Sequence, residues 1–443
     1  MTGPVFTPGD EGFADEAFAW KTTITHTPDV VVGATSSFDV LAAVRFARDN
    51  GMTVEVQATG HGAQGNVGRG MLIVTRRMDS VSVDAATRTA TVGAGAQWAA
   101  VIAAAAPAGL APIPGSSGTV GVVGYLVGGG LGPLARSHGF SSDFITGMTV
   151  VTGAGNLVEA TADENPDLFW ALRGGKEGLG IVTQVRLRLV ELASLYGGSL
   201  TFEGDAIEPA LRAWVEFTAT APDDVSTSVA ILRIPDIDQV PPPLRGRTLL
   251  SLRFAYPGDA ATGESYAAPL RAAAPLFSDD LAEIPAAAIA SVHSDPPDPG
   301  PSWTRGRLLT SFDQDAASVV LAHAGATAQT PLLGVEIRHL GGATRGDVDG
   351  GSAVGGRDNG FTLVLIGAPN PALFDEVLPA VSSALFADLD RWISPSTTIN
   401  FAGHYESPEH YASAWTPETF ARLTSVRERY NPDSTLPNGV RVS

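Results

Sequence analysis

The order of hydrophobic and polar residues predicts β-strands in several short stretches of the first half of the chain, and the alternation is clear in residues 181–192. The stretches are rich in Val, Ile and Thr, and they comprise residues 52–58, 71–75, 81–95, 148–160 and 181–192. A Gly-rich turn divides residues 148–160 into two strands. Because tight turns and short helices separate the strands, residues 26–192 are expected to form an α+β region.

Apolar residues at helical spacing predict helices between these strands. The apolar positions of the first helix are Val40, Leu41, Val44 and Ala47. Ser36 and Ser37 can cap its start, and Gly51 follows its end. Two more helices are expected, one within residues 96–109 and one that Asp163 or Asn165 opens and that contains residues 167–172.

Longer elements follow from about residue 196. Strands are predicted at residues 199–204, 226–234, 247–256, 334–340 and 361–367, with helices near 205–219, 260–275 and 370–389. The Pro-rich stretches 236–246 and 294–303 are interpreted as connections. This pattern favours an antiparallel sheet with helices on one face, and a last helix at 417–430 precedes an irregular end.

Composition limits the class of protein. The chain has 443 residues, which is too long for one ordinary hydrophobic core, and two domains are expected. Its 28 basic and 47 acidic residues give a net charge of −19, which repels nucleic acid and anionic lipid. The absence of Cys excludes disulfides, thiolate nucleophiles and zinc ribbons. No signal peptide or membrane span is recognised, so a cytoplasmic protein is expected.

Three loops concentrate the glycines of the first region, namely residues 58–66, 114–132 and 173–183. Such loops let backbone N–H groups approach an anion or a flat ring, although each loop alone could be only a set of tight turns. Standard nucleotide motifs do not match. Trp98 takes the third glycine position of a dinucleotide fingerprint, and Glu177 replaces the Ser or Thr of a P-loop. The eight His form no metal-ligand pair at helical spacing.

Taken in order, these loops resemble the FAD-linked oxidase family of berberine bridge enzyme and 6-hydroxy-D-nicotine oxidase, which has a PCMH-type FAD-binding domain. The matching motifs are GHGAQG, GSSGTVGVVGYLVGGGLG, HGFSSD, NPDLFWALRGG, GIVT and RYNPDSTL. The resemblance implies an α+β fold, with an FAD-binding domain formed by residues 1–192 and 400–443. Residues 193–399 would form a substrate-binding domain whose antiparallel sheet is covered by helices.

His61 matches the histidine that this family joins to the 8α-methyl group of the flavin, so the resemblance implies covalent FAD. A neutral imidazole can add to the electrophilic methide form of the ring. The loop residues expected to contact the flavin with it are Thr59, Gly60, Gly62 and Ala63. Without the resemblance, His61 could equally be an ordinary loop histidine.

The second motif implies how the flavin is held and reoxidised. Relatives with two covalent links have a Cys where this chain has Ser117, so attachment would be through His61 alone. Val120 matches a position that gates dioxygen and favours an oxidase over a dehydrogenase. Further flavin contacts are expected from Thr119, Gly121, Gly124 and Tyr125.

The remaining motifs match less completely. GGKEGLG departs from the family's GGGGNFG, which leaves the contacts of Lys176 and Glu177 open, whereas Gly180 and Val182 match positions near the adenosine. Asp143 and Arg173 match frequent family residues that are as readily structural.

Two sites near the C-terminal end also match in part. Asn400 matches an Asn near the flavin, but Thr398 replaces the Tyr of that motif. Tyr405 or His404 could substitute for this Tyr, or Tyr405 could be a packed aromatic. Asn438 is a further expected flavin contact.

Substrate oxidation needs a base beside the flavin. In the strand at 334–340, Glu336 and Arg338 share one face, and Val335, Ile337 and His339 share the other. Glu336 is the candidate base, with Arg338 keeping it ionised or binding an anionic substrate. The alternative is a solvent-facing ion pair on an edge strand.

The predicted function is an FAD-dependent oxidase that acts on a small organic alcohol, amine or related secondary metabolite and reduces O2 to H2O2. Its partners would be the small-molecule substrate and dioxygen, with no nucleic acid and no membrane; the sequence does not predict an oligomeric state. One alternative is a flavoprotein of the same fold with a drug-binding, resistance or redox-protective role. Another is a β-rich binding protein without flavin.

Overall fold

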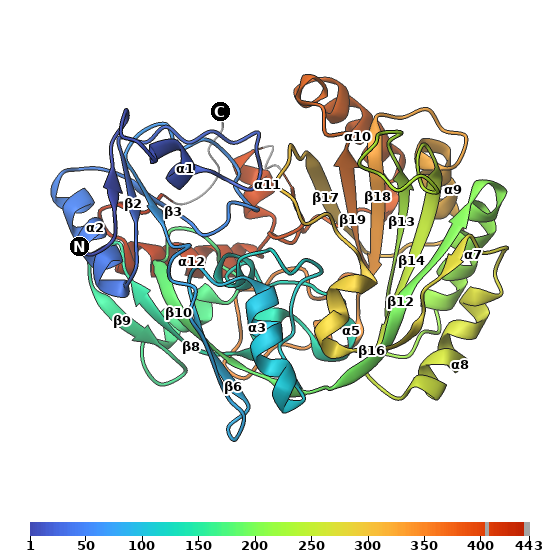
Figure 1. Cartoon of the computed structure of the whole chain (residues 1–443), viewed down its shortest axis with the longest axis horizontal. Helices are drawn as coiled ribbons and strands as arrows, with labels where there is room; N and C mark the ends of the chain where they lie inside the picture. The colour runs from blue at the N-terminus through green and yellow to red at the C-terminus, as the bar shows by residue number, and fades with distance from the viewer. Residues whose placement is uncertain (404–406, 438–443) are drawn as a thin grey trace.

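Three sheets organise the computed structural model, which describes residues 1–403 and 407–437 (Figure 1). The first sheet has the order β1-β2-β4-β3, with β2, β4 and β3 parallel. Its strands are β1 (Val5–Phe6), β2 (Val30–Gly33), β3 (Val54–Gln57) and β4 (Met71–Val74). The second sheet is antiparallel, with the order β5-β6-β10-β8-β9. Its strands are β5 (Val81–Asp84), β6 (Thr89–Gly93), β8 (Ile145–Val151), β9 (Leu157–Ala160) and β10 (Ile181–Arg188).

The helix predicted after Ser36 is confirmed as α2 (Ser37–Asp49). The Ser36 side chain accepts a hydrogen bond from the backbone N–H of Asp39, which satisfies a donor that the first helical turn leaves free. Val40 and Val44 lie fully buried against the first sheet. The helix therefore forms because one side of it supplies core surface and its start supplies a cap.

Short helices connect the strands of the first half. They are α1 (Phe13–Ala17), α3 (Trp98–Ala105), α4 (Val122–Leu126), α5 (Ala135–His138) and α6 (Pro166–Leu172). The helix expected within residues 96–109 is α3, which ends in a 3-10 turn at Ala106–Ala108. Of the two residues expected to open the next helix, Asp163 and Asn165, the structure has Asn165 as the N-cap of α6.

The third sheet is large and antiparallel, with the order β15-β12-β14-β13-β18-β19-β17, and β16 also pairs with β12. Its strands are β12 (Ser194–Glu203), β13 (Ser226–Arg233), β14 (Thr248–Tyr256), β15 (Ser278–Asp279), β16 (Ala282–Pro285), β17 (Thr304–Leu309), β18 (Leu332–His339) and β19 (Phe361–Gly367). The short strands β7 (Leu110–Ala111) and β11 (Val190–Glu191) form a separate antiparallel pair, and β11 lies between β10 and β12 in the chain.

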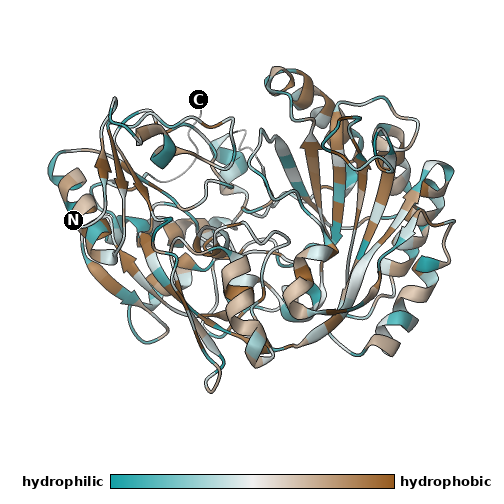
Figure 2. Cartoon of the chain, in the orientation of Figure 1, coloured by the Kyte–Doolittle hydropathy of each residue, from teal (hydrophilic) through white to brown (hydrophobic). Residues whose placement is uncertain are grey.

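Helices cover one face of this sheet, as Figure 1 shows, and they are α7 (Ile207–Thr218), α8 (Ala260–Arg271), α9 (Gln314–Ala324) and α10 (Val377–Asp388). The α+β class with a helix-covered antiparallel sheet is thus confirmed. Figure 2 shows hydrophobic positions along these strands, and Trp214 of α7 is fully buried among them. The sequence patterns missed β17 and α9, and the helix expected from residue 370 begins only at Val377.

The last helices return the chain to the first half. They are α11 (Pro408–Ala412) and α12 (Pro417–Tyr430), and Arg427 of α12 donates to the carbonyl of Gly175 at 2.8 Å. The carbonyl of Thr435 accepts a hydrogen bond from the N–H of Val54 in β3. The exact division into two domains at residue 193 stays a prediction. Over the described ranges, no helix combines the length and apolar character needed to cross a membrane.

Candidate active site

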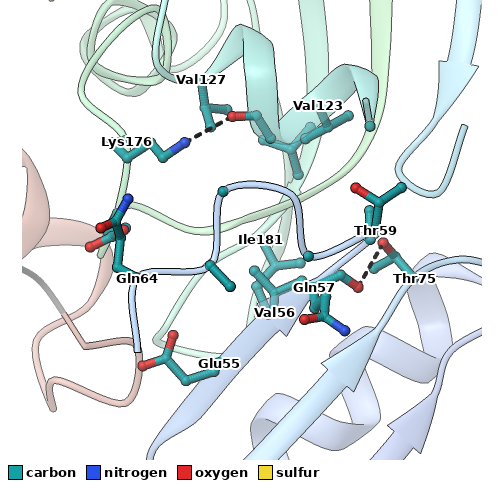
Figure 3. A pocket seen from close by; sticks show the side chains of 18 of the residues that line it. Glu55, Val56, Gln57, Thr59, Gln64, Thr75, Val123, Val127, Lys176 and Ile181 are labelled. Atoms are coloured by element: carbon teal, nitrogen blue, oxygen red, sulfur yellow. Dashed lines mark hydrogen bonds between the residues drawn. The ribbon is translucent and has the colours of Figure 1, made fainter. Parts of the chain in front are cut away.

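The three glycine-rich loops line one cavity of about 450 Å³ (Figure 3). Loop 58–66 follows β3, loop 114–132 contains α4, and loop 173–183 precedes β10. The predicted residues that line the cavity are Thr59, Gly60, His61, Gly62, Ala63, Val120, Gly121, Gly124, Tyr125, Gly180, Val182 and Asn400. The structure therefore brings together loops that are more than a hundred residues apart in the chain.

Hydrogen bonds and a ring stack hold His61 at the cavity wall. Its Nδ1 lies 3.0 Å from Thr59 Oγ1, and its Nε2 lies 3.3 Å from Thr119 Oγ1. Ser117 Oγ lies 3.0 Å from the same Thr119 hydroxyl. Ser117 and Thr119 do not line the cavity themselves, and Ser117 is linked to His61 through Thr119. Trp20 stacks on the imidazole with centroids 4.0 Å apart and an interplanar angle of 17°. Burial lowers the pKa of His61 to about 4, so the ring is neutral at pH 7.

Glycines leave bare main chain on the cavity surface. A Cβ on Gly62 or Gly124 would meet no protein atom within 4 Å, although both residues line the cavity. Gly60 differs, because its φ of +80° favours glycine and a Cβ there would lie 2.7 Å from Ala19 Cβ. Gly60 is thus required by the loop, whereas Gly62 and Gly124 leave space that a bound group can use.

Lys176 is the basic side chain that lines this cavity among the described residues, beside Glu55 and Glu177. Its Nζ donates to the carbonyl of Gly124 at 3.0 Å, and burial lowers its pKa (Figure 3). The third loop has GGKEGLG where the family has GGGGNFG, and this difference places the Lys176 ammonium group in the cavity wall.

Asp143 and Arg173 lie apart from the cavity lining. Asp143 forms a 2.6 Å ion pair with Arg357, and Arg173 donates to the carbonyl of Gly351 at 2.6 Å while it stacks over Phe169. The structural interpretation of these two residues fits their contacts.

Tyr125 and Asn400 form one end of the cavity. The Asn400 amide donates to the backbone carbonyl of Tyr125 at 2.8 Å, which fastens the region near the C-terminal end to α4. The Tyr125 hydroxyl is buried and its pKa is raised, chiefly by burial. Tyr405, His404 and Asn438 lie outside the described residues.

Glu336 and Arg338 lie on β18, which pairs with β13 on one side and β19 on the other. The predicted alternative of a solvent-facing pair on an edge strand is therefore wrong, because β18 is an inner strand and both side chains are almost fully buried. Glu336 Oε1 lies 2.8 Å from Arg338 Nε and 2.9 Å from Arg253 Nη1. Burial raises the pKa of Glu336, but the two arginines outweigh this and hold the pKa below its usual value. The two guanidinium groups therefore keep the Glu336 carboxylate ionised and share its Oε1 atom.

Sequence analysis missed three residues of the site. Trp20, Arg253 and His293 belong to no motif, and His293 directly precedes a Pro-rich stretch that was interpreted as a connection. Across the part of the chain that the structure describes, no group of three His, Asp or Glu side chains could hold a metal ion.

These residues fit a flavin dinucleotide. Bare main chain can approach a flat ring and a pyrophosphate, Lys176 supplies a positive charge, and His61 supplies a neutral nucleophile at the wall.

Comparisons with known proteins agree with this assignment. Residues 28–161 match an FAD binding domain. The chain is 27% identical to (R)-6-hydroxynicotine oxidase of Paenarthrobacter nicotinovorans, over 100% of this chain and 97% of that protein. The crystal structure of 6-hydroxy-D-nicotine oxidase from Arthrobacter nicotinovorans superposes with a TM-score of 0.86 at 22% identity, over 100% and 98% of the two chains. Glucooligosaccharide oxidase from Acremonium strictum, whose FAD is 6-S-cysteinyl and 8α-N1-histidyl, gives a TM-score of 0.84 at 19% identity, over 100% and 97%.

Proposed function

We propose that this member of the PCMH-type FAD-linked oxidoreductases is an oxidase that holds its flavin covalently through His61. The enzyme would oxidise a small organic alcohol, amine or related metabolite and pass the electrons to dioxygen, giving hydrogen peroxide. Bound FAD supplies a hydride acceptor for the substrate C–H bond and a donor of electrons to dioxygen. A purely drug-binding or redox-protective role is not favoured, because the similar proteins are named as oxidases.

The observation that carries the proposal is the arrangement of His61. The imidazole is neutral, its plane is fixed by Trp20, and hydroxyl groups contact both of its nitrogens. One hydroxyl can accept a hydrogen bond from the ring N–H, which leaves the lone pair of the other nitrogen for bond formation. The chain has no Cys, so the thioether of the glucooligosaccharide oxidase cofactor cannot form here. We infer a single link, with Ser117 at the position of the second.

The test is direct. Acid-precipitated protein should stay yellow, and the tryptic peptide that spans residues 49–69 should carry the mass of FAD or of its fragment. Peroxide should form with at least one member of a panel of alcohols, sugars and amines. A colourless precipitate and an unmodified peptide would refute the covalent link, whereas a reducible flavin that yields no peroxide would refute the oxidase.

Flavin attachment should be nearly independent of pH near neutrality and should fail in acid. Protonated imidazole has no lone pair for the new bond, and the pKa of His61 is about 4, so the neutral form dominates above this value. The rate of attachment should be flat from about pH 6 to 8 and fall about tenfold for each pH unit below about 4. Flavin fluorescence of denatured samples, taken after apoprotein is mixed with FAD, measures this rate. Circular dichroism at each pH separates lost attachment from unfolding, and a rate that already falls between about pH 8 and 6 would contradict a depressed pKa.

Gly124→Ala should weaken flavin binding without harming the fold. The added methyl would enter the cavity and meet no protein atom within 4 Å, so its cost falls on the bound cofactor. Overpacking of this kind costs about 1–3 kcal/mol, which is roughly 5- to 150-fold in affinity. Gly124 lies in α4, where alanine favours the helix. Titration with FAD in the His61→Ala background, where no covalent bond can form, and thermal melts of the apoprotein measure the two effects.

Gly68→Ala is the matched control. A Cβ on Gly68 also meets no protein atom within 4 Å, but this residue does not line the cavity. Its FAD affinity should equal that of the unchanged protein. Equal affinity of all three proteins would contradict the placement of the flavin against α4.

A further inference from the structure

Unpartnered polar atoms gather on the face of the large sheet that the helices do not cover. The atoms are Ser228 Oγ, Thr362 Oγ1, Arg253 Nε and both ring nitrogens of His293; all are buried, and none has a hydrogen-bond partner in residues 1–403 and 407–437. Ser228 pairs directly with Arg253 on β14 and with Arg338 on β18, and Arg338 pairs with Thr362 on β19. Cross-strand partners share a face, so these residues form one polar row.

The neighbouring positions show which face this is. Val229, Leu252 and Ile337 alternate with the polar row and belong to the core that contains Trp214 of α7. Because successive strand residues point to opposite faces, the row points away from the helices. Buried polar groups are nearly always hydrogen-bonded, so the open atoms of Ser228, Arg253 and His293, which line one small cavity, indicate a place for a polar ligand or for water.

The side chain of His293 lies against this polar row. It follows the 3-10 helix η4 (Ala286–Val292), and its side chain is 4% exposed. Its Nε2 lies 3.7 Å from Glu336 Oε1. A small cavity of about 20 Å³ is lined by His293, Ser228, Arg253 and Arg338 together with Leu131. This volume admits one water molecule or one hydroxyl-sized substituent.

The row borders the loop that lines the flavin cavity. Arg338 Nη1 donates to the carbonyl of Leu131 at 3.3 Å, and Ser116 Oγ donates to Asp295 Oδ2 at 2.6 Å. Both contacts join the His293 region to loop 114–132, whose Val120, Gly124 and Tyr125 line the larger cavity. The polar row and the flavin cavity thus lie on either side of loop 114–132, and a substrate group that passes this loop would meet His293.

The charged side chains around His293 determine which substrate group can bind beside it. Arg253 and Arg338 are cationic, and both form ion pairs with the Glu336 carboxylate that lies between them. Asp295 also acts on Arg338, but it accepts its hydrogen bond from Ser116. Burial lowers the pKa of His293 well below 6.5, and the charges of Arg338 and Arg253 lower it further. The imidazole is thus a neutral acceptor in a site that repels cations.

We propose that His293 is a catalytic residue that accepts the proton of a substrate hydroxyl group, with Arg253 and Arg338 excluding cationic substrates. This inference rests on the proposed oxidase function. The Glu336 carboxylate favours the ring proton on Nε2, which leaves the lone pair of Nδ1 for the substrate. With FAD bound, the carbinol C–H would supply the hydride, the O–H would give its proton to Nδ1, and a carbonyl product would form. Dioxygen would take the two electrons together with two protons, one of the hydride and one returned from His293, and leave as hydrogen peroxide.

The experiment uses flavin-loaded protein, the variants His293→Gln and His293→Ala, and anaerobic stopped-flow bleaching of the flavin. The probes are primary and secondary alcohols, sugars and phenolic alcohols, each paired with the amine of the same carbon skeleton. The alcohol that reduces the unchanged protein fastest should reduce the Gln variant about 10²–10⁴ times more slowly. Added imidazole should restore part of the rate in the Ala variant. His323→Gln, in a helix on the other face of the sheet, should leave the rate unchanged.

The pH profile gives a second readout. Reduction of the unchanged protein should be constant above about pH 6.5 and fall in acid as His293 takes up a proton, and the Gln variant should lose this fall. The charged groups that face His293 are Arg253, Glu336 and Arg338; the pKa of Glu336 is lowered and the pKa of Arg338 is raised, so neither of these two changes its charge near neutral pH.

The outcomes are distinct. A Gln variant with a native spectrum and a rate within threefold of the unchanged protein overturns the proposal, as does an imidazole-insensitive Ala variant. Faster bleaching by an amine than by its paired alcohol, or no bleaching by any hydroxyl compound, also overturns it. Amine-driven peroxide would leave the oxidase function intact, whereas a protein without bound flavin would remove the oxidase itself.

Discussion

Replacing His61 with alanine should give a folded, yellow protein that loses all of its flavin on acid precipitation. The variant lacks the nucleophile, and the chain has no Cys that could replace it. The cavity walls are mostly main chain, so they can still bind FAD without a covalent bond. The expected change is complete, from fully retained to fully released cofactor, and absorbance of pellet and supernatant measures it.

The fold should survive this substitution. His61 is only half-buried, and its contacts are two neutral hydrogen bonds and one ring stack. Their loss costs about 1 kcal/mol each, which is small beside a stability of about 5–15 kcal/mol. His323→Gln, remote from the cavity, should keep its flavin in the pellet. Flavin that stays attached in the alanine variant would show that another residue makes the bond.

The cavity could be predicted from the sequence because each of its three loops is a continuous stretch of the chain. The φ of +80° that favours glycine at position 60 belongs to the backbone of its own loop. The alternation at 334–340 likewise placed Glu336 and Arg338 on one face. Whether that strand is inner or edge depends on which strands pair with it. One partner, β19, follows β18 closely in the chain, but the other, β13, pairs Ser228 with the distant Arg338, so no local pattern contains this information.

The site residues that the sequence does not predict depend on tertiary contacts and not on local patterns. Trp20, Arg253 and His293 are single side chains in segments without a motif, and only tertiary contacts bring them to the site. His293 immediately precedes the stretch Ser294–Trp303, where prolines indicate a connection but do not show which side chain beside it is buried. Partners such as Glu336 become visible only when the register of the large sheet is known.

Glu336→Ala should be strongly destabilising, by about 3–5 kcal/mol, because it removes the buried carboxylate that two buried guanidinium groups share. The matched control is Glu203→Ala. Glu203 pairs with Arg247 at the half-exposed edge of the same sheet, where an ion pair contributes about 0–1 kcal/mol. Urea unfolding of both variants gives the two free energies of unfolding. A loss at Glu336 no larger than the loss at Glu203 would contradict the buried triad.

The pH dependence of this loss separates an anchoring carboxylate from a catalytic base. The pKa of folded Glu336 is lowered from 4.5, so its stabilising charge is fully present above this value and is lost as pH falls through the folded pKa. The stability gap between the unchanged protein and Glu336→Ala should thus be constant near neutral pH and shrink in acid. If Glu336 only anchors Arg253 and Arg338, Glu336→Gln should keep the acid fall in flavin reduction that His293 produces. Disappearance of that fall in Glu336→Gln, but not in His293→Gln, would move the role of proton acceptor from His293 to Glu336.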